Sequence, residues 1–175
     1  MGSLPGFFHC ACGDVFRSID VHTEVGAAFL KYSSKGQMVP DDITVQLWQS
    51  RIKSCVESRA FKPETDRLVL DGIPRNQYQA RLMNEVLVVE RIFFLTGALD
   101  EAIALRLQKR ALKDNRLNDA SDAVVRRRLE IYKNESISSP DYYPPASITS
   151  INAMSLPHIV LCKILNSLIG QSGKT

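Results

Sequence analysis

The sequence lacks any apolar run near the roughly 18 residues needed to cross a membrane. Its first ten residues also lack the charged and then apolar segments of a secretory leader, and Gly6 stands where a myristoylation motif has Ser or Thr. We therefore expect a soluble cytoplasmic protein with no membrane partner.

Cysteine is scarce, and its spacing matches no disulfide framework. The four cysteines are Cys10, Cys12, Cys55 and Cys162, and the first two lie too close together for a usual zinc knuckle. Small apolar residues alternating in a short strand account for His9, Cys10 and Cys12 without a metal. We expect all four thiols to be reduced.

The sequence also lacks internal repeats, low-complexity tracts and a strong net charge. Of its 175 residues, 45% are apolar and 23% are charged, which is the balance of a globular protein with a core. We expect a single domain over 1–175. The net charge of +3 is too small to indicate nucleic-acid binding. Residues 106–128 hold eight basic and three acidic residues, so the basic character belongs to one segment.

Short apolar runs alternate with longer segments of helical period, a pattern that predicts an α/β fold with a parallel sheet. The predicted strands span 7–10, 67–70, 91–95 and 148–153. The predicted helices span 13–20, 23–34, 40–58, 76–86, 99–112, 119–134 and 156–168.

The sharpest local feature follows the second predicted strand. Asp71 ends that strand, Gly72 allows close approach of an anion to the backbone, and Arg75 is a bidentate partner for oxyanions. An acid at the end of such a strand holds Mg²⁺ or its waters in nucleotide-binding sheets. An ordinary Asp-Gly turn accounts for the same residues, and the local sequence does not separate the two interpretations.

A second feature is the basic segment. Arg106 and Arg110 lie four residues apart and border the apolar stripe of their predicted helix, as expected for a cleft that binds anions. Aliphatic stems that lie along the edge of a core give the same pattern. Arg116 and residues 126–128 follow, so four arginine positions can converge on a polyphosphate.

Five motifs in this order and spacing closely resemble those of adenylate kinases and related nucleoside monophosphate kinases. They lie at 13–17, 36–41, 71–75 with Gln79, 106–110 and 116–128. The resemblance runs from about residue 8 to the C-terminus. It implies the three-layer parallel sheet of the P-loop nucleotide kinases, a monomer, and transfer of the terminal phosphoryl group of ATP, with Mg²⁺, to a nucleoside monophosphate.

The resemblance also implies roles for single residues on the acceptor side, within a monophosphate-binding subdomain at about 11–40. Arg17 and Arg75 would hold the acceptor phosphate. Gln79 would read the base, and because pyrimidine-specific relatives usually have Asn there, AMP is favoured over UMP or CMP. The sugar and base would lie against Cys12, Gly13, Gln37, Val39 and Gly72.

On the donor side, the resemblance implies binding of ATP or ADP and a short lid at about 110–119. Asp71 would order the waters of Mg²⁺. The transferring phosphoryl group would be neutralised by Arg106, Arg110, Arg116 and Arg128, or by Arg127 in place of Arg128.

The sequence departs from the family pattern in several places. Cys12 replaces the usual Thr or Ala, Gln37 replaces a frequent Lys, and the spacing from Arg116 to Arg128 is one residue longer. The main departure is that no glycine-rich loop for the donor phosphates stands before the acceptor-side motif, since only twelve residues precede Gly13. Residues 170–175 resemble the end of such a loop but follow a predicted helix rather than a strand.

In this family the strand before that loop is central, between the strands that here end at Leu70 and Leu95. We therefore expect a sheet without its central strand and impaired phosphoryl transfer, because this chemistry depends on positioning and electrostatics. Two alternatives stay open. One is a non-catalytic nucleotide-binding protein that retains the AMP pocket, and the other is an interaction module that dimerises through the unpaired strands.

Overall fold

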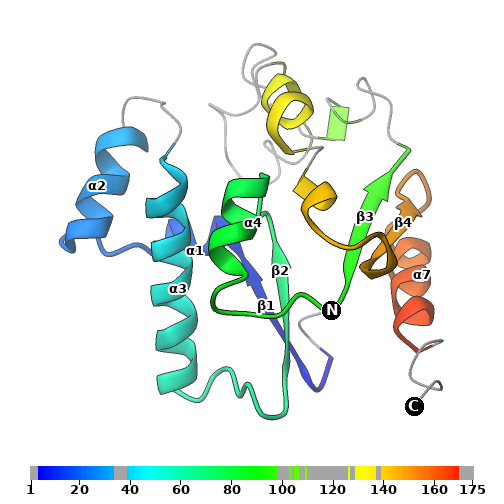
Figure 1. The fold of residues 1–175 in the computed structure, drawn as a ribbon, viewed down its shortest axis with the longest axis horizontal. Helices are drawn as coiled ribbons and strands as arrows, with labels where there is room; N and C mark the ends of the chain where they lie inside the picture. Colours follow the sequence, from blue (N-terminus) through cyan, green and yellow to red (C-terminus); the bar gives the residue numbers. More distant parts are fainter. Residues whose placement is uncertain are drawn as a thin grey trace. The chain divides into compact units, whose positions relative to one another are not determined.

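The structure is a computed structural model that describes residues 4–33, 39–97, 129–136 and 139–169, with single positions at 103, 105, 106, 109 and 126. The chain divides into two compact units, Met1–Leu87 and Val88–Thr175. Figure 1 shows the elements of each unit. Within the described residues, no helix has both the length and the apolar character needed to span a membrane.

The first unit is built on two parallel strands with helices between and around them. Strand β1 pairs with β2 in a register that runs from Phe7 opposite Arg67 to Ala11 opposite Asp71. A parallel pair needs a long crossover, and α1, α2 and α3 supply it. The elements are β1 (Phe7–Ala11), α1 (Cys12–Arg17), α2 (Glu24–Ser33), α3 (Asp41–Glu57), β2 (Arg67–Asp71) and α4 (Gln77–Met83).

The second unit contains another parallel pair. Strand β3 (Ile92–Thr96) pairs with β4 (Ile148–Asn152), from Ile92 opposite Ile148 to Thr96 opposite Asn152. Helix α7 (Pro157–Ile169) follows β4. A π-helical turn and two 3₁₀ turns precede β4, at Tyr132–Ser136, Ser139–Tyr142 and Pro145–Ser147.

The structure confirms an α/β fold with parallel strand pairing, and all four predicted strands lie within one residue of their predicted ends. The described strands form two sheets of two strands each, β1 with β2 and β3 with β4. Most of the predicted helix at 99–112 lies outside the described residues. So does most of the predicted helix at 119–134, up to residue 128.

Polar side chains mark two of the helix ends that differ from the prediction. Helix α1 stops at Arg17, where the Ser18 hydroxyl donates to the carbonyl of Val15 at 3.1 Å. Helix α4 begins at Gln77 because Asn76 is its N-cap and accepts the backbone N–H of Gln79 at 2.8 Å. Residues that bond their own backbone in this way compete with the helix ladder.

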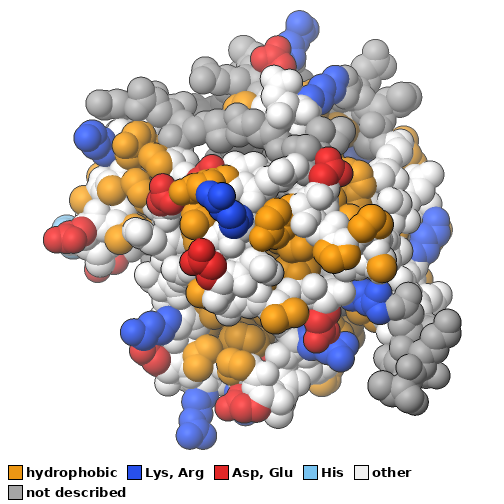
Figure 2. All heavy atoms as spheres, viewed as in Figure 1, with side chains coloured by type: hydrophobic (Ala, Val, Ile, Leu, Met, Phe, Trp, Pro, Cys, Tyr) orange, Lys and Arg blue, Asp and Glu red, His pale blue; other side chains and the backbone are white. Residues whose placement is uncertain are grey.

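The core of the first unit lies where α3 and α4 pack against the strands and α1. Trp48 and Val45 from α3 meet Cys10 of β1 and Met83 of α4 in one buried cluster. Figure 2 shows acidic and basic side chains interspersed on the face it draws, which agrees with the small net charge of the chain.

Met83 has no exposed surface, so we expect Met83→Ala to lower the free energy of unfolding by about 2–5 kcal/mol through lost burial and a residual cavity. Val86 lies three residues later and is 57% exposed. Val86→Ala is the matched control, with a change of about 0.5 kcal/mol or less. Urea unfolding of both variants measures the difference, and equal losses would show that Met83 is not a core residue.

Candidate functional site

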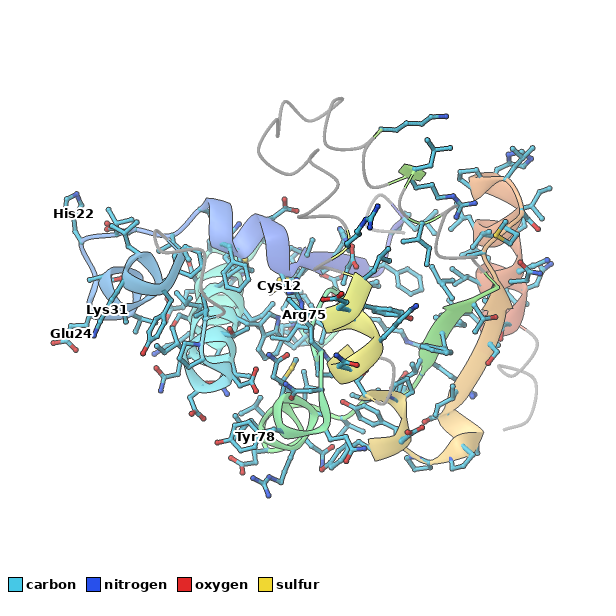
Figure 3. The ribbon with its side chains drawn as sticks, turned by 90° about the horizontal axis from the view of Figure 1, so that it is seen from above. Cys12, His22, Glu24, Lys31, Arg75 and Tyr78 are labelled. Carbon is cyan, nitrogen blue, oxygen red and sulfur yellow. The ribbon has the colours of Figure 1, made fainter. Side chains whose placement is uncertain are left out.

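The carboxyl ends of β1 and β2 bring two predicted motifs together. Ala11 and Asp71 are register partners, so α1, which begins at Cys12, starts beside the turn that follows Asp71. A side-chain carbon placed on Gly72 would lie 3.5 Å from Cβ of Cys12 and 3.9 Å from Nη2 of Arg75. Figure 3 shows Cys12 and Arg75 next to each other. The ends of parallel strands are where α/β proteins bind ligands.

The turn after β2 places an exposed cation at this edge. Gly72 has φ +79°, a conformation that glycine adopts without strain. Its carbonyl accepts a hydrogen bond from Nε of Arg75 at 3.0 Å, which fixes the arginine stem against the turn. Within the described residues no carboxylate forms an ion pair with Arg75, so both Nη groups remain available to a ligand.

Asp71 is the acid at this edge. Its side chain is 74% exposed, and its Oδ2 lies 3.9 Å from Nε2 of His9 on β1. The described residues contain no group of three or more side chains that could hold a metal ion. Mg²⁺ is usually bound by one or two carboxylates together with waters and substrate phosphates, so a single exposed carboxylate suits it. Asp71 fits that role.

Gln79 is buried, and each end of its side-chain amide has one hydrogen-bond partner. Its Oε1 accepts the backbone N–H of Arg75 at 2.8 Å, and its Nε2 donates to Oδ1 of Asp41 at 2.6 Å. Asn76 donates from Nδ2 to Oδ2 of the same carboxylate at 2.9 Å. These bonds connect the first turn of α3 to the start of α4 and the Arg75 turn.

Cys12 is buried beneath the Arg75 turn. Burial raises the pKa of its thiol, Arg75 lowers it by a smaller amount, and Asp71 adds a further small increase. Cys12 is therefore a neutral thiol. Its side chain packs in the buried core, and its backbone lies at the carboxyl ends of β1 and β2. Gly13 in α1 and Val39 before α3 are both half-buried.

The described residues leave part of the acceptor prediction open. Arg17 is the last residue of α1, but its side chain lies outside the description, and so does Gln37. Their roles stay predictions.

Of the predicted donor-side arginines, the structure describes Arg106. It belongs to the second unit, where its Nη1 donates to the carbonyl of Ala153 at 3.2 Å, just after β4. Arg75 lies in the first unit, so convergence of the two arginines stays a prediction. Arg110, Arg116, Arg127 and Arg128 lie outside the described residues.

The sequence analysis assigned no role to Asp41 or Asn76, and it set His9 aside as an ordinary strand residue. A signal for the first two was present, because Asn76-x-x-Gln79 resembles a capping box and Asp41 follows a proline at a helix start. His9 became recognisable only from the strand register, which sets its strand beside the one that ends at Asp71.

Comparison with known proteins identifies relatives along most of the chain. A family model described as adenylate kinase matches residues 4–148. An adenylate kinase of Mycobacterium leprae is 30% identical over 165 residues, which cover 93% of this chain and 86% of that protein. An adenylate kinase of Bifidobacterium longum is 31% identical over 137 residues, covering 75% of this chain and 69% of that protein. An adenylate kinase of Rhodococcus erythropolis is 31% identical, with coverage of 93% and 86%.

The buried thiol of Cys10 gives a pH prediction. Burial, and to a smaller extent nearby Cys55, raise its pKa from 9.0 to about 11. The unfolded chain thus loses this proton at lower pH than the folded chain. The resulting stabilisation is complete below pH 9 and is lost as pH rises toward 11.

Between pH 8 and pH 10.5, we expect this thiol to account for about 2 kcal/mol of the loss in unfolding free energy. Urea unfolding at both pH values should therefore show a smaller loss for Cys10→Ala than for the wild type. Cys162 is exposed, so Cys162→Ala should behave as the wild type does. An unchanged loss in Cys10→Ala would contradict the prediction.

Proposed function

Because the chain belongs to the adenylate kinase family and has a nucleoside monophosphate kinase-like function, we propose that its first unit is the acceptor site for AMP. The reaction is transfer of a phosphoryl group from ATP to AMP, which gives two ADP. The observation that carries the proposal is the exposed Arg75 turn beside Cys12 at the ends of β1 and β2.

The acceptor phosphate is a dianion, and the Arg75 guanidinium suits it. Its Nε is bound to Gly72, which leaves the two Nη groups to form a charge-assisted, bidentate contact with phosphate oxygens. Arg17 supplies the second positive charge from α1. Gly72 lets the backbone approach the ligand closely because it has no side chain.

The nucleoside lies against the backbone on the same edge. Gln79 reads the base from the start of α4, and its identity favours AMP. The sugar and base contact Cys12, Gly13, Gln37, Val39 and Gly72.

Asp71 would hold the waters of a bound Mg²⁺ ion, which would supply neutralisation of charge on the phosphates of ATP. The second unit contributes arginines that stabilise the transferring group. They are Arg106, Arg110, Arg116 and Arg128, or Arg127 in its place.

We further propose that the two strand pairs belong to one three-layer parallel sheet of the P-loop nucleotide kinase type, whose central strand is not among the described residues. The parallel pairing within each strand pair supports this proposal. Without the loop that follows that strand, the donor phosphates lose their backbone N–H contacts, and transfer by these residues alone is impaired. We take the chain to be a monomer.

Arg75→Ala should weaken AMP binding by about ten- to a hundredfold, because it removes charge-assisted hydrogen bonds to the phosphate. Arg81→Ala is the matched control, since Arg81 lies on α4 and packs over the ring of Tyr78, and both variants lower the net charge by one. Isothermal titration calorimetry of the wild type and both variants measures the dissociation constants. Equal affinity in the wild type and Arg75→Ala would contradict the acceptor site.

A coupled assay for ADP formation separates an impaired kinase from an ordinary one. With ATP, AMP and Mg²⁺, we expect turnover at least about a hundredfold below that of the Mycobacterium leprae relative under the same conditions. Any residual activity should fall further in Arg75→Ala. Turnover within a few-fold of the relative would contradict the impairment, and AMP binding without turnover would indicate the non-catalytic alternative.

A further inference from the structure

The Gln79 amide is held by two groups of opposite hydrogen-bonding character. The backbone N–H of Arg75 can only donate, and it points to Oε1 of Gln79 at 2.8 Å. The ionised Asp41 carboxylate can only accept, and it receives Nε2 at 2.6 Å. A half-turn of the amide would set N–H against N–H and oxygen against oxygen. The two neighbours therefore fix the orientation of the amide, with Oε1 toward Arg75 and Nε2 toward Asp41.

Asp41 is itself fixed in place. Its second oxygen accepts Nδ2 of Asn76 at 2.9 Å, and Oδ1 of Asn76 accepts the backbone N–H of Gln79 at 2.8 Å. Asp41 also lies in the first turn of α3, where the helix dipole favours a negative charge. Gln79 is only 3% exposed, so its amide lies within the fold and is held by these neighbours.

These contacts leave the amide one donor and one acceptor in a fixed order. A glutamine amide has two N–H groups and two acceptor lone pairs, and the bonds to Arg75 and Asp41 use one of each. A 6-aminopurine offers an acceptor at ring position 1 and a donor at position 6. A 6-oxopurine offers the reverse. A freely turning amide matches either base. For a base that the phosphate and sugar contacts hold in one pose, a fixed amide matches only one of the two, and in the proposed function that base is the adenine of AMP.

We propose that Asp41 determines the specificity of the acceptor site: by orienting the Gln79 amide, it selects 6-aminopurine over 6-oxopurine nucleoside monophosphates. This inference rests on the proposed function, in which Gln79 reads the base of AMP. Asp41 acts through Gln79 and is a positioning residue.

The experiment is a titration of the wild type, Asp41→Asn and Asp42→Asn with AMP and with inosine monophosphate, which differ at position 6 of the base. Asparagine has an oxygen at one of these two positions and an NH₂ group at the other, so either Asn76 or Gln79 faces a donor in place of an acceptor. We expect the ratio of AMP affinity to inosine monophosphate affinity to fall at least about tenfold in Asp41→Asn.

Asp42→Asn removes the same charge from the same helical turn, and it weakens a different contact to α4, the 2.9 Å bond from the Tyr78 hydroxyl. Its affinity ratio should equal that of the wild type. The ratio is insensitive to partial unfolding, because a loss of folded protein lowers the apparent affinity for both nucleotides by the same factor. Asn76→Ser provides a second variant: it keeps a capping oxygen, removes the donor to Asp41, and should lower the ratio by a smaller factor.

An unchanged ratio in Asp41→Asn, or in Asn76→Ser if the first variant does not fold, would overturn the role of Asp41 and leave AMP binding intact. An equal fall in Asp42→Asn would also overturn it, because the effect would then come from charge alone. A wild type that binds neither nucleotide would overturn the proposed function and this inference together.

Discussion

The parallel pairing of β1 with β2 is the interaction on which the site depends. It sets Ala11 opposite Asp71, so a helix start from one part of the chain and a glycine-containing turn from another reach the same edge. Neither segment is a phosphate site by itself: α1 is short, and an Asp-Gly pair is a common turn. Brought together, they place a closely approachable backbone beside an exposed guanidinium, as recognition of a phosphate monoester requires.

The buried polar network around Gln79 satisfies this amide within the fold, and in our proposal the same bonds set the selectivity of the site. A buried amide without partners is costly, and here each end of the amide has a partner of the right kind. The arrangement joins α3 to α4 across the base of the Arg75 turn. Such a network has one satisfied state, so the position of the amide follows from the fold rather than from a ligand.

Much of the local structure was predictable. The strands were predictable, because short runs of β-branched and aromatic residues between turn residues are typical of strands. The helix ends were less predictable, since Ser18 and Asn76 form side-chain hydrogen bonds that set where α1 ends and where α4 begins. Within the candidate site, the closeness of Cys12, Gly72 and Arg75 was expected from the family resemblance. The partner of Gln79 was not, because Asp41 lies 38 residues away along the chain.

The amino-acid sequence by itself determined the order of strands and helices, the family, and the residue types at the acceptor edge. These depend on local periodicity and on motifs that are contiguous in the chain. The tertiary structure alone decided which strands pair and in what register, which thiols are buried, and which way the Gln79 amide faces. The physical reason is that burial and hydrogen-bond direction depend on groups distant in the chain, whose positions exist only once the strands and helices have packed.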